Sequence, residues 1–459
     1  MTGSFSTTTR NYRKEENVKM VKVTYKWISV GIATILHFFV DGLCLCCLYL
    51  MIPSGAHDDL LGLFLTYNLL AFSTQPLTGW WVDRLQKLHW ILLLSIGLLM
   101  IAVVLMILCE SKLLSSPFTF WMVAILLGMG NSLFHVWGGK MTILVVGNDM
   151  RALGIFVSTG AMGLVVGLTY ASLWVAVGLL LLIALMGTFA IRIPVINTKF
   201  VQEKVFRLNT SRLQLFRTEE IWLIPILLFV FVRSFVGESI SLNIEKNSAM
   251  LFMLAMTAMV GKAGGGWVAR CWGVGASIVA CVGVAVACML WSINGTNRLL
   301  PVLIGVLTIN FTMPMTLYLA NRVLPGREGQ SFGLLAMVLI PGYMLAHCGS
   351  LPFQVYFMLA ALLLTISVEL GMLQLMGEKR RKVFVGSVVI NILTNIPLNL
   401  VLIAVGSTIG SLLTGELLVL MVEAIGYYIL IHEWKRVFIY SLLCNVTSFL
   451  VGVLVQFMI

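Results

Sequence analysis

The sequence predicts an all-α membrane protein that crosses the bilayer many times, and three observations support this fold class. Of its 459 residues, 59% are hydrophobic and 11% are charged, whereas a soluble domain has about a quarter of its residues charged. Apolar stretches long enough to span a bilayer recur along the whole chain. Short motifs from the first part of the chain also return, in the same order, in a later part.

The apolar stretches are the individual membrane-spanning elements. A helix needs about 20 predominantly apolar residues to cross the hydrocarbon core of a bilayer. By this measure the sequence predicts fifteen spanning helices, at residues 27–51, 60–82, 88–109, 118–140, 152–170, 172–192, 221–242, 248–269, 274–293, 299–320, 331–348, 353–376, 383–405, 409–431 and 437–458.

Basic residues are concentrated in alternate loops between these helices. The loops "VDRLQKLH", "GEKRRK" and "HEWKR" each contain Arg or Lys, whereas "PSGAHDD" and "GSTIGS" on the opposite side contain neither. Cytoplasmic loops are enriched in Lys and Arg, so the tail at 1–26 is expected in the cytoplasm and the carboxyl end outside the cell membrane. The same bias explains the net charge of +11 without a nucleic-acid partner.

Three pairs of motifs indicate that the body of the chain is duplicated. The pairs are "HFFVDG" at 37–42 with "RSFVGE" at 233–238, "GWWVDR" at 79–84 with "GGWVAR" at 265–270, and "GNDMRALG" at 147–154 with "GREGQSFG" at 326–333. Their common order predicts two six-helix bundles related by a pseudo-twofold axis, joined by a basic linker. The predicted parts are a tail at 1–26, bundles at 27–192 and 221–376, a linker at 193–220 and a three-helix segment at 377–459.

The loop "GWWVDRLQK" resembles the Gly-x-x-x-Asp-Arg signature of the major facilitator superfamily of secondary transporters, and Gly79, Asp83 and Arg84 match it. In that family the loop has a gating role: glycine permits close helix approach, and the Asp meets a helix end or an Arg when the cytoplasmic side is shut. The resemblance covers residues 27–376. It implies a secondary active transporter that works by alternating access.

The second copy of the signature, in "GKAGGGWVARCWG", is incomplete. Gly265 and Arg270 are kept, but Ala269 stands where the Asp would be. We therefore expect the gating charge to be asymmetric, with the first half dominant. The run "GMGNSLFHVWGG" is similar to the fosmidomycin-resistance branch of the superfamily and favours efflux, although Ala124 replaces the early Arg of drug–proton antiporters.

Polar residues inside the spans mark the candidate site. The resemblance implies that the first, fourth, seventh and tenth helices line a central cavity, and these helices carry most of the buried polar groups. The candidates are His37, Asp41, Asn131, His135, Arg233, Glu238 and Asn310, with His347 on the eleventh helix.

His37 and Asp41 are four residues apart and so share one face of a helix. A carboxylate at mid-membrane costs about 2.5 kcal/mol or more, so its presence suggests a function. We expect Asp41, His37 and His135 to carry protons in a wet cavity, because imidazole changes charge near neutral pH. A purely structural hydrogen-bonded pair remains the alternative for His37 and Asp41, and a packing histidine for His135.

Arg233 is the candidate for binding an anionic or amphipathic small molecule. The repeat aligns it with His37, which makes Asp41 a plausible partner for it across the cavity. Asn131, Asn310, Glu238 and His347 are the other expected substrate contacts.

No metal site, cofactor or enzymatic motif is predicted, and a monomer is expected. Polar residues in the last three helices, among them Asn391, Asn395, Asn399, Glu416, Glu423 and Asn445, are expected to hold that segment together. The function indicated is proton-coupled transport. The alternative is a transporter-fold receptor, scramblase or regulatory membrane protein without ion coupling.

Overall fold

The structure, a computed structural model, describes residues 4–52, 60–192 except 86 and 115, 222–294 except 243 and 246, 298–347, and parts of 365–394 and 419–447. The predicted linker at 193–220 and most of the predicted span at 353–376 lie outside the described residues. The chain divides into two compact units, Met1–Ala346 and His347–Ile459.

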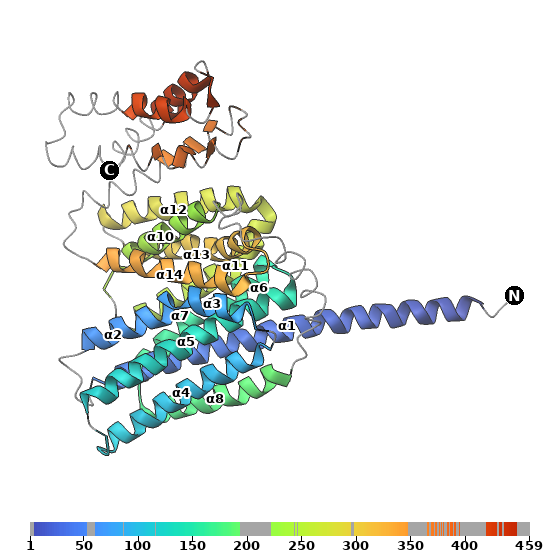
Figure 1. Cartoon of the computed structure of the whole chain (residues 1–459), viewed down its shortest axis with the longest axis vertical. Coiled ribbons are helices and arrows are strands. Elements are labelled where there is room, and N and C mark those ends of the chain that lie inside the picture. The colour runs from blue at the N-terminus through green and yellow to red at the C-terminus, as the bar shows by residue number, and fades with distance from the viewer. Residues whose placement is uncertain are drawn as a thin grey trace. The chain divides into compact units, whose positions relative to one another are not determined.

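The first unit is helical throughout its described part and forms the two neighbouring groups of helices in Figure 1. The first half contains α1 (Ser4–Leu50), α2 (Leu60–Asn68), the π-helix η1 (Leu69–Ser73), α3 (Gln75–Val82), α4 (His89–Glu110), α5 (Pro117–Val146), α6 (Met150–Ser158), α7 (Gly160–Thr169) and α8 (Leu173–Arg192). The second half contains α10 (Leu223–Leu242), α11 (Ser248–Trp272), α12 (Val274–Asn294), α13 (Leu299–Val323) and α14 (Glu328–His347).

Ten helical segments in the described residues are long and apolar enough to cross a membrane. They coincide with ten of the predicted spans, and the all-helical multi-pass fold class is confirmed. The predicted span at 60–82 is instead broken into α2, η1 and α3. Pro76, in the first turn of α3, has no N–H to continue the helical hydrogen bonds, which explains a break at this place.

Close packing of α1 against α7 positions the site. A Cβ added at Gly163 would overlap the backbone of Phe38, and one at Gly167 would overlap the backbone of Gly42. Small residues allow two helix backbones to approach each other closely in a membrane. The α7 glycines therefore bring this helix directly against the stretch of α1 that contains His37 and Asp41.

One pair of the duplicated motifs, at 147–154 and 326–333, adopts a similar local structure in the two halves. Gly147 and Gly326 have φ values of 73° and 81°, in the left-handed region that glycine tolerates best. Each is followed within three residues by the start of a helix, α6 at Met150 and α14 at Glu328. This correspondence supports the internal repeat.

Buried carboxylates lie in the second unit. Asn445 donates to Glu423 Oε2 at 2.5 Å, and Thr394 donates to Glu423 Oε1 at 3.2 Å. Asn391 donates to Glu369 Oε2 at 2.5 Å. Polar residues of the last predicted helices thus do meet one another, while Asn395, Asn399 and Glu416 lie outside the described residues.

Candidate functional site: a buried imidazole–carboxylate cluster

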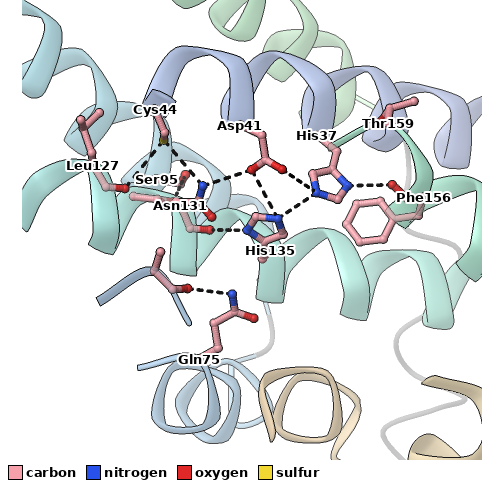
Figure 2. Close-up of polar contacts among 12 residues, drawn as sticks. His37, Asp41, Cys44, Gln75, Ser95, Leu127, Asn131, His135, Phe156 and Thr159 are labelled. Carbon is pink, nitrogen blue, oxygen red and sulfur yellow. Dashed lines mark hydrogen bonds and ion pairs between the residues drawn. The ribbon is translucent and has the colours of Figure 1, made fainter. Parts of the chain in front are cut away.

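Two helices of the first half place four of the predicted site residues together (Figure 2). His37 and Asp41 lie one turn apart on α1, and Asn131 and His135 lie one turn apart on α5. All four are buried, with exposed fractions of 5%, 7%, 1% and 8% in that order. The i, i+4 spacing seen in the sequence therefore does place each pair on one inward face.

The two imidazoles and the carboxylate converge on one point. His37 Nε2 lies 3.2 Å from Asp41 Oδ2, and His135 Nε2 lies 3.5 Å from Asp41 Oδ1. The two Nε2 atoms are 2.8 Å apart, which is hydrogen-bond distance.

The outer nitrogens of both rings face backbone carbonyls. His37 Nδ1 lies 2.8 Å from the carbonyl oxygen of Phe156, and His135 Nδ1 lies 3.2 Å from that of Asn131. A carbonyl oxygen can only accept, so each Nδ1 must carry the hydrogen to make its bond. A neutral imidazole has one N–H, which leaves both Nε2 atoms with lone pairs directed at each other and at Asp41.

The cluster is therefore one positive charge short when Asp41 is ionised and both rings are neutral. A contact of 2.8 Å between two lone pairs requires a hydrogen, and the neutral rings have none left for it. A single added proton on one Nε2 would satisfy this contact and offset the charge of Asp41. The geometry is that of a site for a small cation.

Asn131 links the cluster to residues that the sequence analysis did not single out. Its Nδ2 donates to Asp41 Oδ1 at 3.1 Å and to the Tyr67 hydroxyl at 2.9 Å, and it lies 3.6 Å from Cys44 Sγ. Its Oδ1 is buried and has no hydrogen-bond partner. Tyr67 and Cys44 had no signal beyond being polar or polarisable residues in apolar runs.

Gly160, the first residue of α7, covers the cluster on a further side. A Cβ at this position would overlap Asp41 Oδ2 and His37 Nε2. Thr159, just before it, donates from its hydroxyl to the carbonyl of Thr34 at 2.7 Å and fixes the start of α7 against α1. The absence of a side chain at Gly160 is thus what leaves room between the three polar groups.

Two predicted site residues of the second half, Arg233 and Asn310, do not join this cluster. Arg233 on α10 is 7% exposed, and its Nε is buried without a hydrogen-bond partner. Among the described residues it forms no ion pair with Asp41, because that carboxylate is enclosed by His37, His135 and Asn131. Asn310 donates to the carbonyl of Val306 on its own helix at 2.8 Å.

The remaining candidates of this half are Glu238, which is half-buried on α10, and His347, whose side chain lies outside the described residues. The sequence analysis missed Lys262 on α11, the second residue of "GKAGG", although a lysine inside a predicted span is a signal in itself. Lys262 lies close enough to Arg233 and Asp41 to interact with their charges.

Asp83 joins the two halves at one end of the helices. Its Oδ1 accepts from the N–H of Gly329 at 2.8 Å, and its Oδ2 accepts from the N–H of Gln330 at 2.9 Å. These are free N–H groups of the first turn of α14, where a negative charge is also favoured by the helix dipole. Lys140 Nζ lies 3.1 Å from Asp83 Oδ1, and both side chains are about nine-tenths buried.

Gly79 completes this contact, which we call the Asp83 corner and define by Gly79, Asp83, Lys140, Gly329 and Gln330. A Cβ at Gly79 would overlap the carbonyl group of Gly329. Arg84 takes no part in the corner: it stacks on Trp80 with 3.4 Å between its guanidinium carbon and the ring centre.

The equivalent contact of the repeat, between α11 and α6, has Ala269 in place of the carboxylate. A Cβ at Gly266 would overlap the backbone of Met150 and Arg151, so we call Gly266, Met150 and Arg151 the Gly266 corner. Gly265, the predicted gating residue, packs instead on the Phe311 carbonyl within its own half.

At the Gly266 corner the start of α6 is capped by Asp149 from its own half. The N–H of Arg151 donates to Asp149 Oδ1 at 2.9 Å. Hydrogen bonding from Arg151 lowers the pKa of Asp149, and the charge of the exposed Arg270 lowers it further. Arg270 therefore acts on this corner by charge alone.

Comparisons with known proteins agree on the fold. No family model and no curated protein matches the sequence. The structure of the E. coli fucose:proton symporter matches with 10% identity over 70% of this chain and 90% of that chain, with a TM-score of 0.53.

Two structures of a bacterial homologue of the iron transporter ferroportin in its outward-facing state also match, each over 70% of this chain. One is 14% identical over 92% of that chain with a TM-score of 0.46, and the other, with soaked iron, is 15% identical over 91% with a TM-score of 0.45. The chain is a multi-pass membrane protein with the fold of the major facilitator superfamily transporters.

Proposed function

We propose that this protein is a secondary active transporter of the major facilitator superfamily that moves a small molecule by alternating access, coupled to protons. The observation that carries the proposal is the convergence of His37 Nε2, His135 Nε2 and Asp41 with one proton too few. A proton on either Nε2 would supply the hydrogen that this contact lacks and would face the carboxylate of Asp41. The balance between the protonated and unprotonated cluster would then depend on what surrounds Asp41 in each arrangement of the halves.

The groups that face Asp41 come from four elements. His37 is on its own helix, His135 is on α5, Tyr67 is on α2 and Lys262 is on α11. Lys262 belongs to the second half, so any motion of the two halves changes the positive charge near Asp41. This is a direct way to link the protonation of the cluster to the position of the halves.

The Asp83 corner and the Gly266 corner are the proposed gate. We place them at the cytoplasmic face of the cell membrane, as the distribution of basic loops indicates. The contacts at both corners are formed in this structure. In this proposal they correspond to a conformation shut toward the cytoplasm. Opening requires the two halves to separate at both corners, which breaks the bonds from Asp83 to α14.

Arg233 and Lys262 favour a cargo with a negative charge. Both lie in membrane-spanning helices of the second half, and neither forms an ion pair among the described residues. An unpaired cation in a membrane is costly, so a carboxylate or phosphate group of a substrate is the natural partner. Efflux is the direction that the resemblance of α5 favours.

The test is flux in proteoliposomes. Compounds that raise the melting temperature of the purified full-length protein would be screened first, and then their flux measured with and without a pH gradient. Wild type and His89→Gln, a histidine outside the cluster, should show gradient-driven flux. Asp41→Asn should bind the compound but lose the dependence on the gradient.

Two results contradict the proposal. Gradient-driven flux that is unchanged in Asp41→Asn would rule out coupling through this cluster. Absence of gradient-driven flux for every compound that binds would support the alternative, a receptor, scramblase or regulatory protein with the same fold. The incomplete second signature, with Ala269 in place of the Asp, is consistent with that alternative.

A further inference from the structure

We propose that His37, Asp41 and His135 also form a binding site for a divalent first-row transition-metal ion such as Mn²⁺, Fe²⁺, Co²⁺ or Zn²⁺. The three residues each offer one ligand atom, and these atoms all lie within 4.8 Å of one another. Two imidazoles with one carboxylate are a donor set typical of this class of ion.

The spacing of the donors fits a metal coordination sphere. Metal–ligand bonds to His nitrogen and carboxylate oxygen are about 2.0–2.2 Å long, so neighbouring ligands of a tetrahedral or octahedral ion lie roughly 3.0–3.5 Å apart. The observed separations are 2.8 Å between the two Nε2 atoms, 3.2 Å from His37 to Asp41 and 3.5 Å from His135 to Asp41. A small movement of one ring would place all three donors at bonding distance.

The outer nitrogens of the two histidines have the partners that metal-binding histidines normally have. His37 Nδ1 donates to the carbonyl of Phe156 and His135 Nδ1 donates to that of Asn131. Such bonds fix the tautomer with the Nε2 lone pair turned toward the metal. A structural hydrogen-bonded pair would not need both lone pairs to point at one place.

Asn131 adds a second, independent sign of a missing ligand. It is 1% exposed, its Nδ2 holds Asp41 in place, and its buried Oδ1 has no hydrogen-bond partner. Buried polar atoms are almost always paired, and an unpaired one often marks an unfilled ion or water site. The lack of a second carboxylate and the two nitrogen donors disfavour Ca²⁺ and Mg²⁺, which prefer oxygen.

A metal and a proton would exclude each other, because both need the lone pairs of the same three atoms. If the proposed transport function holds, the cluster could exchange a metal ion for protons as the halves move. The metal site itself does not depend on transport, so it can be tested without flux.

The test is Co²⁺ titration of the full-length protein in detergent, purified with an affinity tag that contains no histidine. The visible absorption of bound Co²⁺ reports coordination by nitrogen and oxygen. Wild type and the control His89→Gln should bind one Co²⁺ per chain. His37→Gln, Asp41→Asn and His135→Gln should each lose at least about 100-fold in affinity, more than loss of an outer-shell partner would cost.

Gly160→Ala tests the space without removing a donor. Its Cβ would overlap Asp41 Oδ2 and His37 Nε2, so it should also abolish the Co²⁺ absorption. Melting temperatures of all variants show whether they are folded. An absorption that is absent in wild type, or that persists in the folded ligand variants, would overturn the proposal.

The two proposals fail separately. Co²⁺ binding without any gradient-driven flux would keep the metal site and contradict the transport function. Flux that depends on Asp41 in a protein that binds no Co²⁺ would keep the transport function and contradict the metal site.

Discussion

The Asp83 corner and the Gly266 corner occupy equivalent places in the two halves of the repeat, but different forces hold them. At the Asp83 corner, the buried carboxylate of Asp83 accepts from the start of α14 in the other half. The same carboxylate forms an ion pair with Lys140 of its own half. At the second, Ala269 stands where the carboxylate would be, and glycine lets the two backbones touch. Loss of one acid from the signature has therefore not removed the contact, only the carboxylate that would cross it.

The difference shows how each helix start is satisfied. The first N–H groups of α14 depend on Asp83 from the opposite half, so they lose their partner when the halves separate. The start of α6 is capped by Asp149 of the same half and keeps its partner in every arrangement of the halves. In the proposed gate, the helix start at the Asp83 corner therefore depends on the opposite half, whereas the helix start at the Gly266 corner does not.

The largest expected effect comes from added bulk at either corner. Gly79→Ala and Gly266→Ala each place a Cβ into backbone of the opposite half, which cannot move aside like a side chain, and should disfavour closure by about 3 kcal/mol. The control is Gly97→Ala on α4, where nothing lies within 4 Å of the new atom. A cysteine placed at the buried Ser331 should then label faster in Gly79→Ala than in wild type or Gly97→Ala.

Removal of the Asp83 carboxylate should have the next largest effect, and it should distinguish the Asp83 corner from the Gly266 corner. Asp83→Ala leaves Lys140 with its hydrogen bond to the Val82 carbonyl but without its ion-pair partner, and it leaves the two α14 N–H groups without an acceptor. We expect this to cost the closed state about 3 kcal/mol. Asp149→Ala removes a helix cap within one half and should cost about 1 kcal/mol of stability, with little effect on closure. Equal labelling rates at Ser331→Cys in the two variants would contradict the view that Asp83 holds the two halves together while Asp149 acts within one half.

A smaller effect is expected from Lys140→Gln. The ion pair with Asp83 is lost, but the carboxylate still accepts from Gly329 and Gln330. Closure should weaken by about 1–2 kcal/mol, less than in Asp83→Ala. The same labelling rate measures it, and a loss as large as that of Asp83→Ala would show that Lys140, not α14, is the main partner.

The smallest effect is predicted for Ala269→Asp, which restores the signature. The N–H of Arg151 is already bound by Asp149, and a second acid there would face the charge of the first. We expect the free energy of unfolding, obtained from thermal melting curves, to change by no more than about 0.5 kcal/mol. A clear gain in stability would mean that an acid at this position can bind the start of α6, as Asp83 binds the start of α14.

Much of this fold was predictable from the sequence because membrane spans and loop charges are strong local signals. Residue spacing also placed His37 with Asp41 and Asn131 with His135 on common faces, and the loop motif identified Asp83 as the residue that meets a helix end. The break at η1 was not predicted, although "STQP" at 73–76 interrupts the apolar stretch there.

The remaining features depend on contacts between distant segments. Lys140 and Gly266 could not be assigned to the corners without knowing which helices cross there. The predicted pair of Asp41 with Arg233 is not formed, because the repeat gives equivalent positions but not which side chain encloses the carboxylate. Gly160 leaves space beside Asp41, which depends on how α7 crosses α1 and is not visible in the sequence.

The most direct test of the account is a distance distribution between spin labels on α3, at Trp81, and just before α14, at Arg327, measured by pulsed electron paramagnetic resonance. Both residues are exposed in the closed arrangement. The account predicts a short distance in wild type and Asp149→Ala, and a shift of the population to longer distances in Asp83→Ala. The same distribution in all three proteins would contradict it.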